Sequence, residues 1–97
     1  MNKDWYVYII SNKKRGVLYI GVTSNLAQRI YQHKHHLFKN SFSDKYKLNK
    51  LVYYEIFYNH DHAFTREKIL KKWKREWKIS LIENNNSTWQ DLYYSLF

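Results

Sequence analysis

The chain has 97 residues, and its 17 Lys and Arg exceed its 8 Asp and Glu enough to give a formal net charge of +9. A chain of this length buries about 65% of the surface of its unfolded state, so we expect one domain over residues 1–97 with a small core and no large cofactor cavity. The absence of Cys excludes disulfides, thiolate metal sites and a cysteine nucleophile, and two glycines are too few for a P-loop or a dinucleotide-binding fingerprint.

Two short runs rich in Tyr, Val and Ile, residues 5–10 and 17–22, flank a turn-like segment and predict an antiparallel hairpin. If the loop is symmetric, Tyr8 lies opposite Tyr19 and Tyr6 lies opposite Gly21. One face of the hairpin is then uniformly apolar and faces a core, and the other face carries the tyrosines.

A helix is expected next, because Thr23, Ser24 and Asn25 are N-cap candidates and an apolar stripe continues to about residue 37. Arg29 and His33 lie along this stripe. One interpretation is that Arg29 and His33 form a pair on the solvated side of the helix. However, they lie in line with apolar residues, where an unpaired guanidinium is costly to bury, so the position of Arg29 implies an anionic partner.

The remaining elements follow from the same patterns. Residues 40–50 are polar and irregular, and residues 51–57 predict a third strand. Asp61 is the expected cap of a second helix, a shorter helical piece is expected around residues 79–83, and a last helix is expected from Ser87 or Thr88 with one apolar face formed by Trp89, Leu92, Tyr93 and Leu96. The order β-β-α-β-α-α plus a C-terminal helix predicts an α+β fold, with a three-stranded antiparallel sheet flanked by helices.

The surplus of positive charge and the 20% aromatic content suit nucleic acid, because cations neutralise phosphates and aromatic rings stack on bases. An anionic membrane surface or solubility alone also explains the charge. Residues 16–28, the longest stretch without Asp, Glu, Lys or Arg, are shorter than the about 20 apolar residues of a membrane helix. No membrane segment is expected, and because the N-terminus lacks a signal-peptide pattern we expect a cytoplasmic protein.

Glu67 has two interpretations. It precedes Lys71 by four residues, an arrangement that stabilises a helix through an ion pair. It also lies at the border of the apolar face of its predicted helix, at the head of a row formed by Lys71, Lys74 and Lys78. In this second interpretation the carboxylate is a metal ligand, and the row of lysines that follows it is a track for phosphates. The tyrosines likewise have a plain interpretation, which is cross-strand packing.

These residues resemble a known family. The segments Tyr6-Val7-Tyr8 and Tyr19-Ile20-Gly21, followed by Arg29 ten residues on, His33 four further, and then Glu67, are similar to the motifs of the GIY-YIG nuclease superfamily. The likeness extends over nearly the whole chain and points to the small single-domain bacterial branch, through Arg66-Glu67-Lys68, Lys71-Lys72-Trp73-Lys74-Arg75, Leu81-Ile82-Glu83, Asn86 and Trp89-Gln90-Asp91-Leu92.

The resemblance implies a metal-dependent endonuclease that hydrolyses phosphodiester bonds in DNA or in a structured nucleic acid. Glu67 would hold one Mg²⁺ or Mn²⁺, since Mg²⁺ often uses one or two carboxylates plus water and phosphate oxygens. Tyr19 would orient or deprotonate the attacking water, and Tyr8 and His33 are candidates for a proton relay. Arg29 would pair with the scissile phosphate.

Two positions depart from the family pattern. Tyr6 stands where the first motif has Gly, and Asn86-Ser87 stands where the family has Asn-Pro. Asn86 either orders the site or caps the last helix. Besides the lysine row, the loop residues are expected to contact phosphates without reading bases: Lys13, Lys14 and Arg15.

Other side chains carry weaker signals. The spacings of His35, His36, His60 and His62 do not match a zinc signature. The helical periodicity of Trp73, Trp77 and Trp89 indicates core positions. The alternative to an enzyme is a non-catalytic nucleic-acid-binding module that keeps the nuclease fold, and a third hypothesis is a catalytic subunit directed by a protein partner.

Overall fold

The computed structural model describes residues 3–97, so the first two residues of the segment that lacks a signal-peptide pattern lie outside it. Its strands form one sheet in the order β2-β1-β3, with both pairs antiparallel. The predicted α+β class is therefore confirmed. In chain order the elements are β1 (Trp5–Ser11), β2 (Leu18–Thr23), α1 (Leu26–Lys34), α2 (Phe42–Lys45), β3 (Lys50–Phe57), α3 (His60–Lys72), α4 (Arg75–Asn85) and the 3₁₀ helix η1 (Leu92–Leu96).

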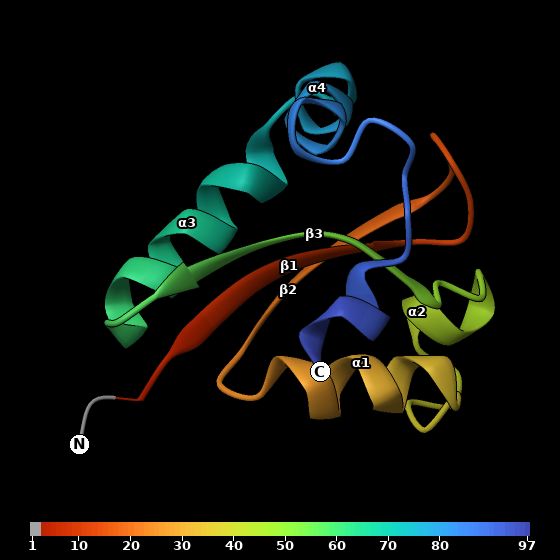
Figure 1. Ribbon diagram of the computed structural model, residues 1–97, viewed down its shortest axis with the longest axis horizontal. Coiled ribbons are helices and arrows are strands. Elements are labelled where there is room, and N and C mark those ends of the chain that lie inside the picture. Colours follow the sequence, from red (N-terminus) through yellow and green to blue (C-terminus); the bar gives the residue numbers. More distant parts are fainter. Residues whose placement is uncertain (1–2) are drawn as a thin grey trace.

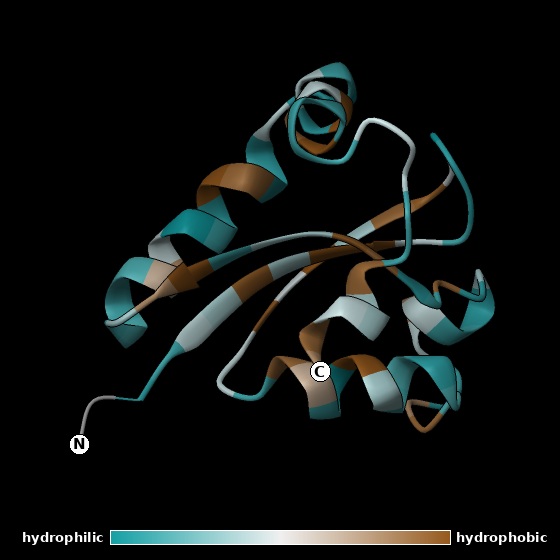
Figure 2. Ribbon diagram, in the orientation of Figure 1, coloured by the Kyte–Doolittle hydropathy of each residue, from teal (hydrophilic) through white to brown (hydrophobic). Residues whose placement is uncertain are grey.

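The sheet separates two groups of helices (Figure 1). Helices α3 and α4 cover one face, and α1 and η1 cover the other. Apolar residues run along the strands, whereas hydrophilic residues colour much of the helical surface (Figure 2). None of the helices within residues 3–97 is long and apolar enough to cross a membrane.

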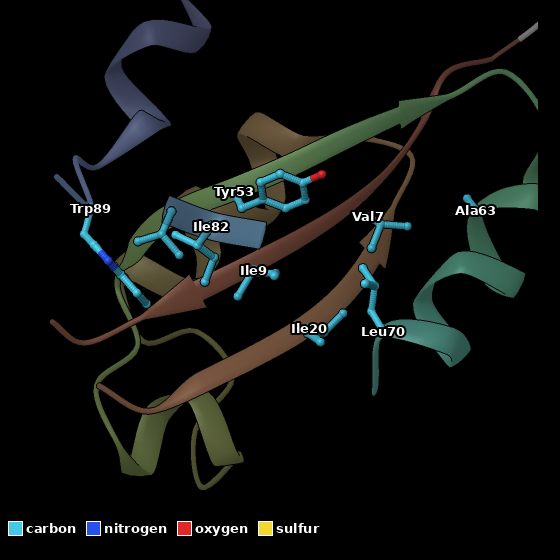
Figure 3. Close-up of a cluster of buried hydrophobic side chains, with 9 residues drawn as sticks. Val7, Ile9, Ile20, Tyr53, Ala63, Leu70, Ile82 and Trp89 are labelled. Carbon is cyan, nitrogen blue, oxygen red and sulfur yellow. The ribbon is translucent and has the colours of Figure 1, made fainter. Parts of the chain in front are cut away.

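Each face of the sheet has its own hydrophobic cluster. The cluster under α3 and α4 is built from strand residues, from helix residues and from Trp89 of the C-terminal loop (Figure 3). Its labelled members are Val7, Ile9, Ile20, Tyr53, Ala63, Leu70, Ile82 and Trp89. The second cluster lies under α1 and η1 and includes the buried residues Tyr8, Ile10, Leu26, Ile30, Leu48 and Leu51.

The register of the β1–β2 hairpin is shifted by two from the symmetric prediction, which was wrong. Tyr8 lies opposite Gly21, and Tyr19 lies opposite Ile10. The shift arises because Ser11 extends β1, whereas Val17 joins the loop and donates its amide proton to Asn12 Oδ1. Because the shift is even, every side chain keeps its predicted face.

Gly21 provides the space for the Tyr8 ring. A Cβ atom at Gly21 would lie 2.4 Å from Tyr8 Oη, far inside contact distance. Tyr8, rather than Tyr6, therefore occupies the gap that the missing side chain leaves.

Strand β3 carries a bulge at Val52, where its register against β1 shifts between Ile9 and Ile10. The buried Asn86 donates from Nδ2 to the Val52 carbonyl at 3.0 Å and to the Gln90 carbonyl at 2.8 Å. Asn86 thus fastens the end of α4 to the bulge. Of the two interpretations of Asn86, capping of the last helix is wrong, since the side chain of Asp91 caps η1, and ordering of the site stays a prediction.

Several helix boundaries also differ from the prediction. Helix α1 ends at Lys34, and Asn59 rather than Asp61 caps α3. The segment expected to be irregular contains α2. Helix α4 begins at Arg75, earlier than the expected helical piece, because the chain leaves α3 in an extended conformation at Trp73 and Lys74.

The predicted last helix with its single apolar face is wrong. Trp89 adopts a positive φ of 58° outside any helix and packs under α4, whereas Leu92, Tyr93 and Leu96 pack on the opposite face of the sheet. Trp77 is also not a core residue, because the break before α4 turns it outward and leaves 51% of it exposed.

Candidate active site

A hollow of about 280 Å³ lies where β2, α1 and α2 meet. Strand β2 contributes Tyr19, α1 contributes Arg29 and His33, and α2 contributes Phe42 and Ser43. Arg29 and His33 are four residues apart, so they project from one side of α1. Asn25 fixes the start of that helix by accepting a hydrogen bond from the Gln28 amide at 3.1 Å.

A chain of hydrogen bonds runs behind the hollow. Tyr8 Oη lies 3.0 Å from His33 Nε2, and His33 Nδ1 lies 3.0 Å from Ser43 Oγ. Ser43 Oγ in turn lies 3.1 Å from Ser41 Oγ. Because Tyr8, His33 and Ser43 are all buried, each hydroxyl and ring nitrogen depends on the next member of the chain for its partner.

Burial sets the protonation states of Tyr8 and His33. The pKa of Tyr8 is raised well above its usual value, first by burial and then by the neighbouring Tyr19, with a smaller contribution from Glu67 and an opposing effect of Arg29. The pKa of His33 is lowered to about 4, first by burial and then by the positive charge of Arg29. Near neutral pH, Tyr8 therefore keeps its proton and His33 is a neutral ring that donates one hydrogen bond and accepts another.

Arg29 has no counter-ion of its own. It forms no ion pair with any residue from 3 to 97, and its guanidinium lies over the Phe38 ring, 5.6 Å from the centroid. The sequence implied an anionic partner for this side chain, and the described part of the protein supplies none. The guanidinium at the wall of the hollow therefore has its charge available for an external anion.

Glu67 reaches this region from α3, on the other side of the sheet. It does not line the hollow, but its charge contributes to the raised pKa of Tyr8, whose hydroxyl lies over Gly21 of the edge strand β2. Its carboxylate is largely buried, with 14% of the side chain exposed, and Lys71 Nζ lies 3.4 Å away. Glu67 lines neither hollow, but its ion-pair partner Lys71 lines a second hollow of about 240 Å³ together with Tyr19.

The donor chemistry at Glu67 fits a hard divalent cation. No group of three or more His, Asp or Glu in the described part of the chain is arranged to hold a metal, so Glu67 stands as a single carboxylate. Mg²⁺ tolerates this situation because it retains several waters and takes substrate phosphate oxygens as ligands.

The residues expected to contact phosphates do not form one helical row. The break between α3 and α4 separates Lys71 from Lys74 and Lys78, but the fold brings Lys78 back, so that its Nζ lies 3.5 Å from the Lys71 carbonyl. Both lysines line the second hollow, whereas Lys74 lies over Trp77. In the hairpin loop, Lys13 and Lys14 are exposed.

Arg15, by contrast, already has a carboxylate partner. It donates to both carboxylate oxygens of Glu83, at 2.9 and 2.8 Å. Its guanidinium therefore anchors the hairpin loop to α4.

Ser43 and Phe42 are the site residues that the sequence analysis missed. Both lie on α2, inside the segment that was expected to be irregular because it has no apolar periodicity. One signal was present: Ser41 and Asp44 have the spacing of a helix-capping pair, and Ser41 Oγ accepts a hydrogen bond from the Asp44 amide at 3.2 Å.

Comparisons with known proteins show the family of the chain. Residues 4–80 match the GIY-YIG catalytic domain family, and the chain belongs to that family. It is 39% identical over 85 residues to a UPF0213 protein of Clostridium perfringens, a match that covers 84% of this chain and 85% of the relative. It is 28% identical over 90 residues to a UPF0213 protein of Desulfotalea psychrophila, covering 93% and 81% of the two chains. No solved structure matches the chain significantly.

Proposed function

We propose that this protein is a metal-dependent endonuclease that hydrolyses phosphodiester bonds in DNA or in a structured nucleic acid. The observation that carries the proposal is the unpaired guanidinium of Arg29 beside the buried Tyr8–His33–Ser43 chain, in a hollow that admits a phosphate group. Family membership supports the reaction class, and the net charge of +9 supports a polyanionic substrate.

Arg29 binds the scissile phosphate in this proposal. A guanidinium offers two parallel donors to phosphate oxygens and stabilises the charge that builds on them during displacement. Glu67 holds one Mg²⁺ or Mn²⁺, and when bound the ion supplies positive charge near the oxygens of the reacting phosphate.

Tyr19 is the residue that orients or deprotonates the attacking water. It lines the hollow, whereas Tyr8 is fully buried and its raised pKa keeps the hydroxyl protonated. Tyr8 and His33 are joined by a hydrogen bond between Oη and Nε2, and their rings lie about 6 Å from the Tyr19 ring, so they are the candidates for a proton relay beside Tyr19. Water forms the new bond to phosphorus and gives up a proton on the side of Tyr19, while the bond to the leaving sugar oxygen breaks and that oxygen takes up a proton from solvent.

The decisive test is the replacement Glu67→Gln, with cleavage measured on single-stranded, duplex, branched and RNA substrates in Mg²⁺ or Mn²⁺ and with an EDTA control. Gln keeps the shape of the side chain but removes the charge that holds the ion, so cleavage should fall by several orders of magnitude while binding survives. Glu76→Gln is the matched control, since Glu76 is an exposed residue on α4 with the same change of charge.

Two outcomes would contradict the proposal. If Glu67→Gln cuts as fast as the parent protein at saturating Mg²⁺, Glu67 is only the helix partner of Lys71. If the parent protein binds nucleic acid but cuts none of the substrates, it is a non-catalytic binding module.

Salt dependence provides a separate test of phosphate contact. Because Lys71, Lys78 and the loop lysines contact phosphates without reading bases, affinity should fall steeply between about 50 and 200 mM salt, with weak sequence preference. Equilibrium binding by fluorescence anisotropy measures this directly. An affinity that stays constant over the range would rule out the phosphate contacts.

A further inference from the structure

Phe42 and Tyr19 form an aromatic ridge between two hollows. Their ring planes differ by 28° and their centroids lie 6.4 Å apart. Both residues line the hollow that contains Arg29 and also the second hollow beside it, of about 240 Å³. Phe42 is 49% exposed, so its ring projects from α2 with about half of its surface in contact with solvent.

Each hollow combines the ridge with positive charge. The first contains Arg29, which has no ion-pair partner among residues 3–97. The second has an apolar lining from Leu18 and Ile20, and Lys71 and Lys78 stand at its wall. An aromatic wall with a neighbouring cation is the combination that binds a flat base and its phosphate.

We propose that Phe42, supported by Tyr19, inserts between two successive bases of the bound strand and that each hollow takes one of the separated nucleotides. The inference rests on the proposed function, because the hollow with Arg29 is also the one that holds the scissile phosphate. It specifies the substrate class as a strand whose bases are unpaired at the cleavage position.

The energetics favour a single strand over a continuous duplex. Separating two stacked and paired bases costs free energy at each step, whereas a single strand or an unpaired junction has already lost its pairing. Stacking on the ridge offsets this cost only in part, since one base on an aromatic side chain raises affinity by about 5- to 150-fold. An intact duplex therefore gains little from the ridge, and an unpaired strand gains most of it.

The test measures binding without divalent metal, so that the strand stays intact. The probes are a single-stranded oligonucleotide with 2-aminopurine at an internal position, and the same sequence as a duplex. The single strand should bind more tightly than the duplex by tenfold or more, and 2-aminopurine fluorescence should rise on binding because the base loses its stacked neighbour.

Substitutions at the ridge sharpen this test. Phe42→Ala should weaken single-strand binding by about 5- to 150-fold and remove the fluorescence rise. Phe42→Leu preserves the apolar packing of α2 but lacks a flat ring, so it should show the same loss of affinity, and Phe42→Trp should retain the tight binding. Tyr58→Ala is the matched control, since Tyr58 is 74% exposed and lies outside both hollows.

The outcomes separate this inference from the nuclease proposal. Equal affinity for single strand and duplex, or unchanged affinity and fluorescence in both Phe42→Ala and Phe42→Leu, overturns the ridge even if the protein cuts DNA in Mg²⁺. Aromatic-dependent binding without any cleavage by the parent protein overturns the nuclease proposal and supports the ridge.

Discussion

The two faces of the sheet differ in the polarity of their buried side chains and in the pairing of their charged groups. Under α3 and α4 an apolar cluster is joined by the buried Asn86, and each of two arginines donates two hydrogen bonds to a carboxylate, Arg15 to Glu83 and Arg66 to Glu55. Under α1 and α2, the buried set includes the Tyr8–His33–Ser43 chain, and Arg29 has no carboxylate partner within residues 3–97.

Under the proposed function, this difference separates a face that stabilises the fold from a face that binds the substrate. A buried polar chain contributes less to folding than apolar packing of the same volume, and each member that loses its partner becomes costly. An arginine near a buried histidine also disfavours the charged form of that histidine. The side chains on the α1 face that can transfer protons and bind an anion therefore contribute less to the free energy of unfolding than apolar side chains would.

The largest change in stability should come from the apolar face. Leu70 is fully buried on α3, so Leu70→Ala should lower the free energy of unfolding by about 2–5 kcal/mol. Urea denaturation measures the loss. Ile69→Ala on the same helix is the matched control, because Ile69 is 45% exposed and should show a much smaller change. Equal losses in both variants would contradict the division of the two faces.

The sequence predicted the fold class and the faces of the hairpin because both depend on local patterns. Alternating side chains put Tyr8 and Tyr19 on the polar face under either register, since a shift by two preserves alternation. The bulge at Val52 and the separation of Trp89 from Leu92 depend on contacts between distant segments. The pattern of apolar residues along the chain does not depend on those contacts. For this reason the sequence predicted one helix where Trp89 and Leu92 pack on opposite faces of the sheet.

The candidate site was predicted to a similar extent. The spacing of Arg29 and His33 indicated one helix face, and the structure places both beside Tyr8 and Tyr19. No local pattern indicated that Arg15 would already be bound to Glu83, because these residues are 68 positions apart. Ser43 was missed for a different reason: it lies only ten residues from its partner His33, but in a segment without apolar periodicity that was expected to be irregular.

A second substitution tests the chain of hydrogen bonds through Tyr8, His33 and Ser43 directly. Ser43→Ala removes the partner of His33 Nδ1 and leaves a buried ring nitrogen unpaired, which should cost about 1–3 kcal/mol of unfolding free energy. Nitrogen NMR shifts of His33 should also show a change in tautomer population, which a purely structural loss would not produce. Ser43→Thr keeps the hydroxyl and should restore the parent spectrum. An unchanged tautomer in Ser43→Ala would show that Ser43 does not orient the ring.

Acid should weaken the polar face through His33. Its pKa of about 4 in the folded state lies below the ordinary value of 6.5, so the unfolded state binds more protons between these values. The free energy of unfolding is therefore highest above pH 6.5 and falls as the pH is lowered toward 4. The fall between pH 7 and pH 5 should be about 1–2 kcal/mol. Urea denaturation at both pH values measures the change. His33→Gln should lose less over the same range, and an equal loss would assign the effect to other groups.

The smallest change in stability should come from the two arginines, which differ in what they bind. Arg15→Gln removes an exposed ion pair with Glu83, so it should destabilise the protein slightly at low salt and less at high salt. Its guanidinium is already engaged, so affinity for single-stranded DNA should barely change.

Arg29→Gln removes a charge that has no described partner, so the free energy of unfolding should stay constant or rise. Affinity for single-stranded DNA should fall, and the salt dependence of binding should become shallower by about one phosphate contact. Urea denaturation and fluorescence anisotropy on both variants measure the two effects. If Arg15→Gln weakens binding as much as Arg29→Gln, the ion pair with Glu83 opens in the complex and the hairpin loop belongs to the binding surface.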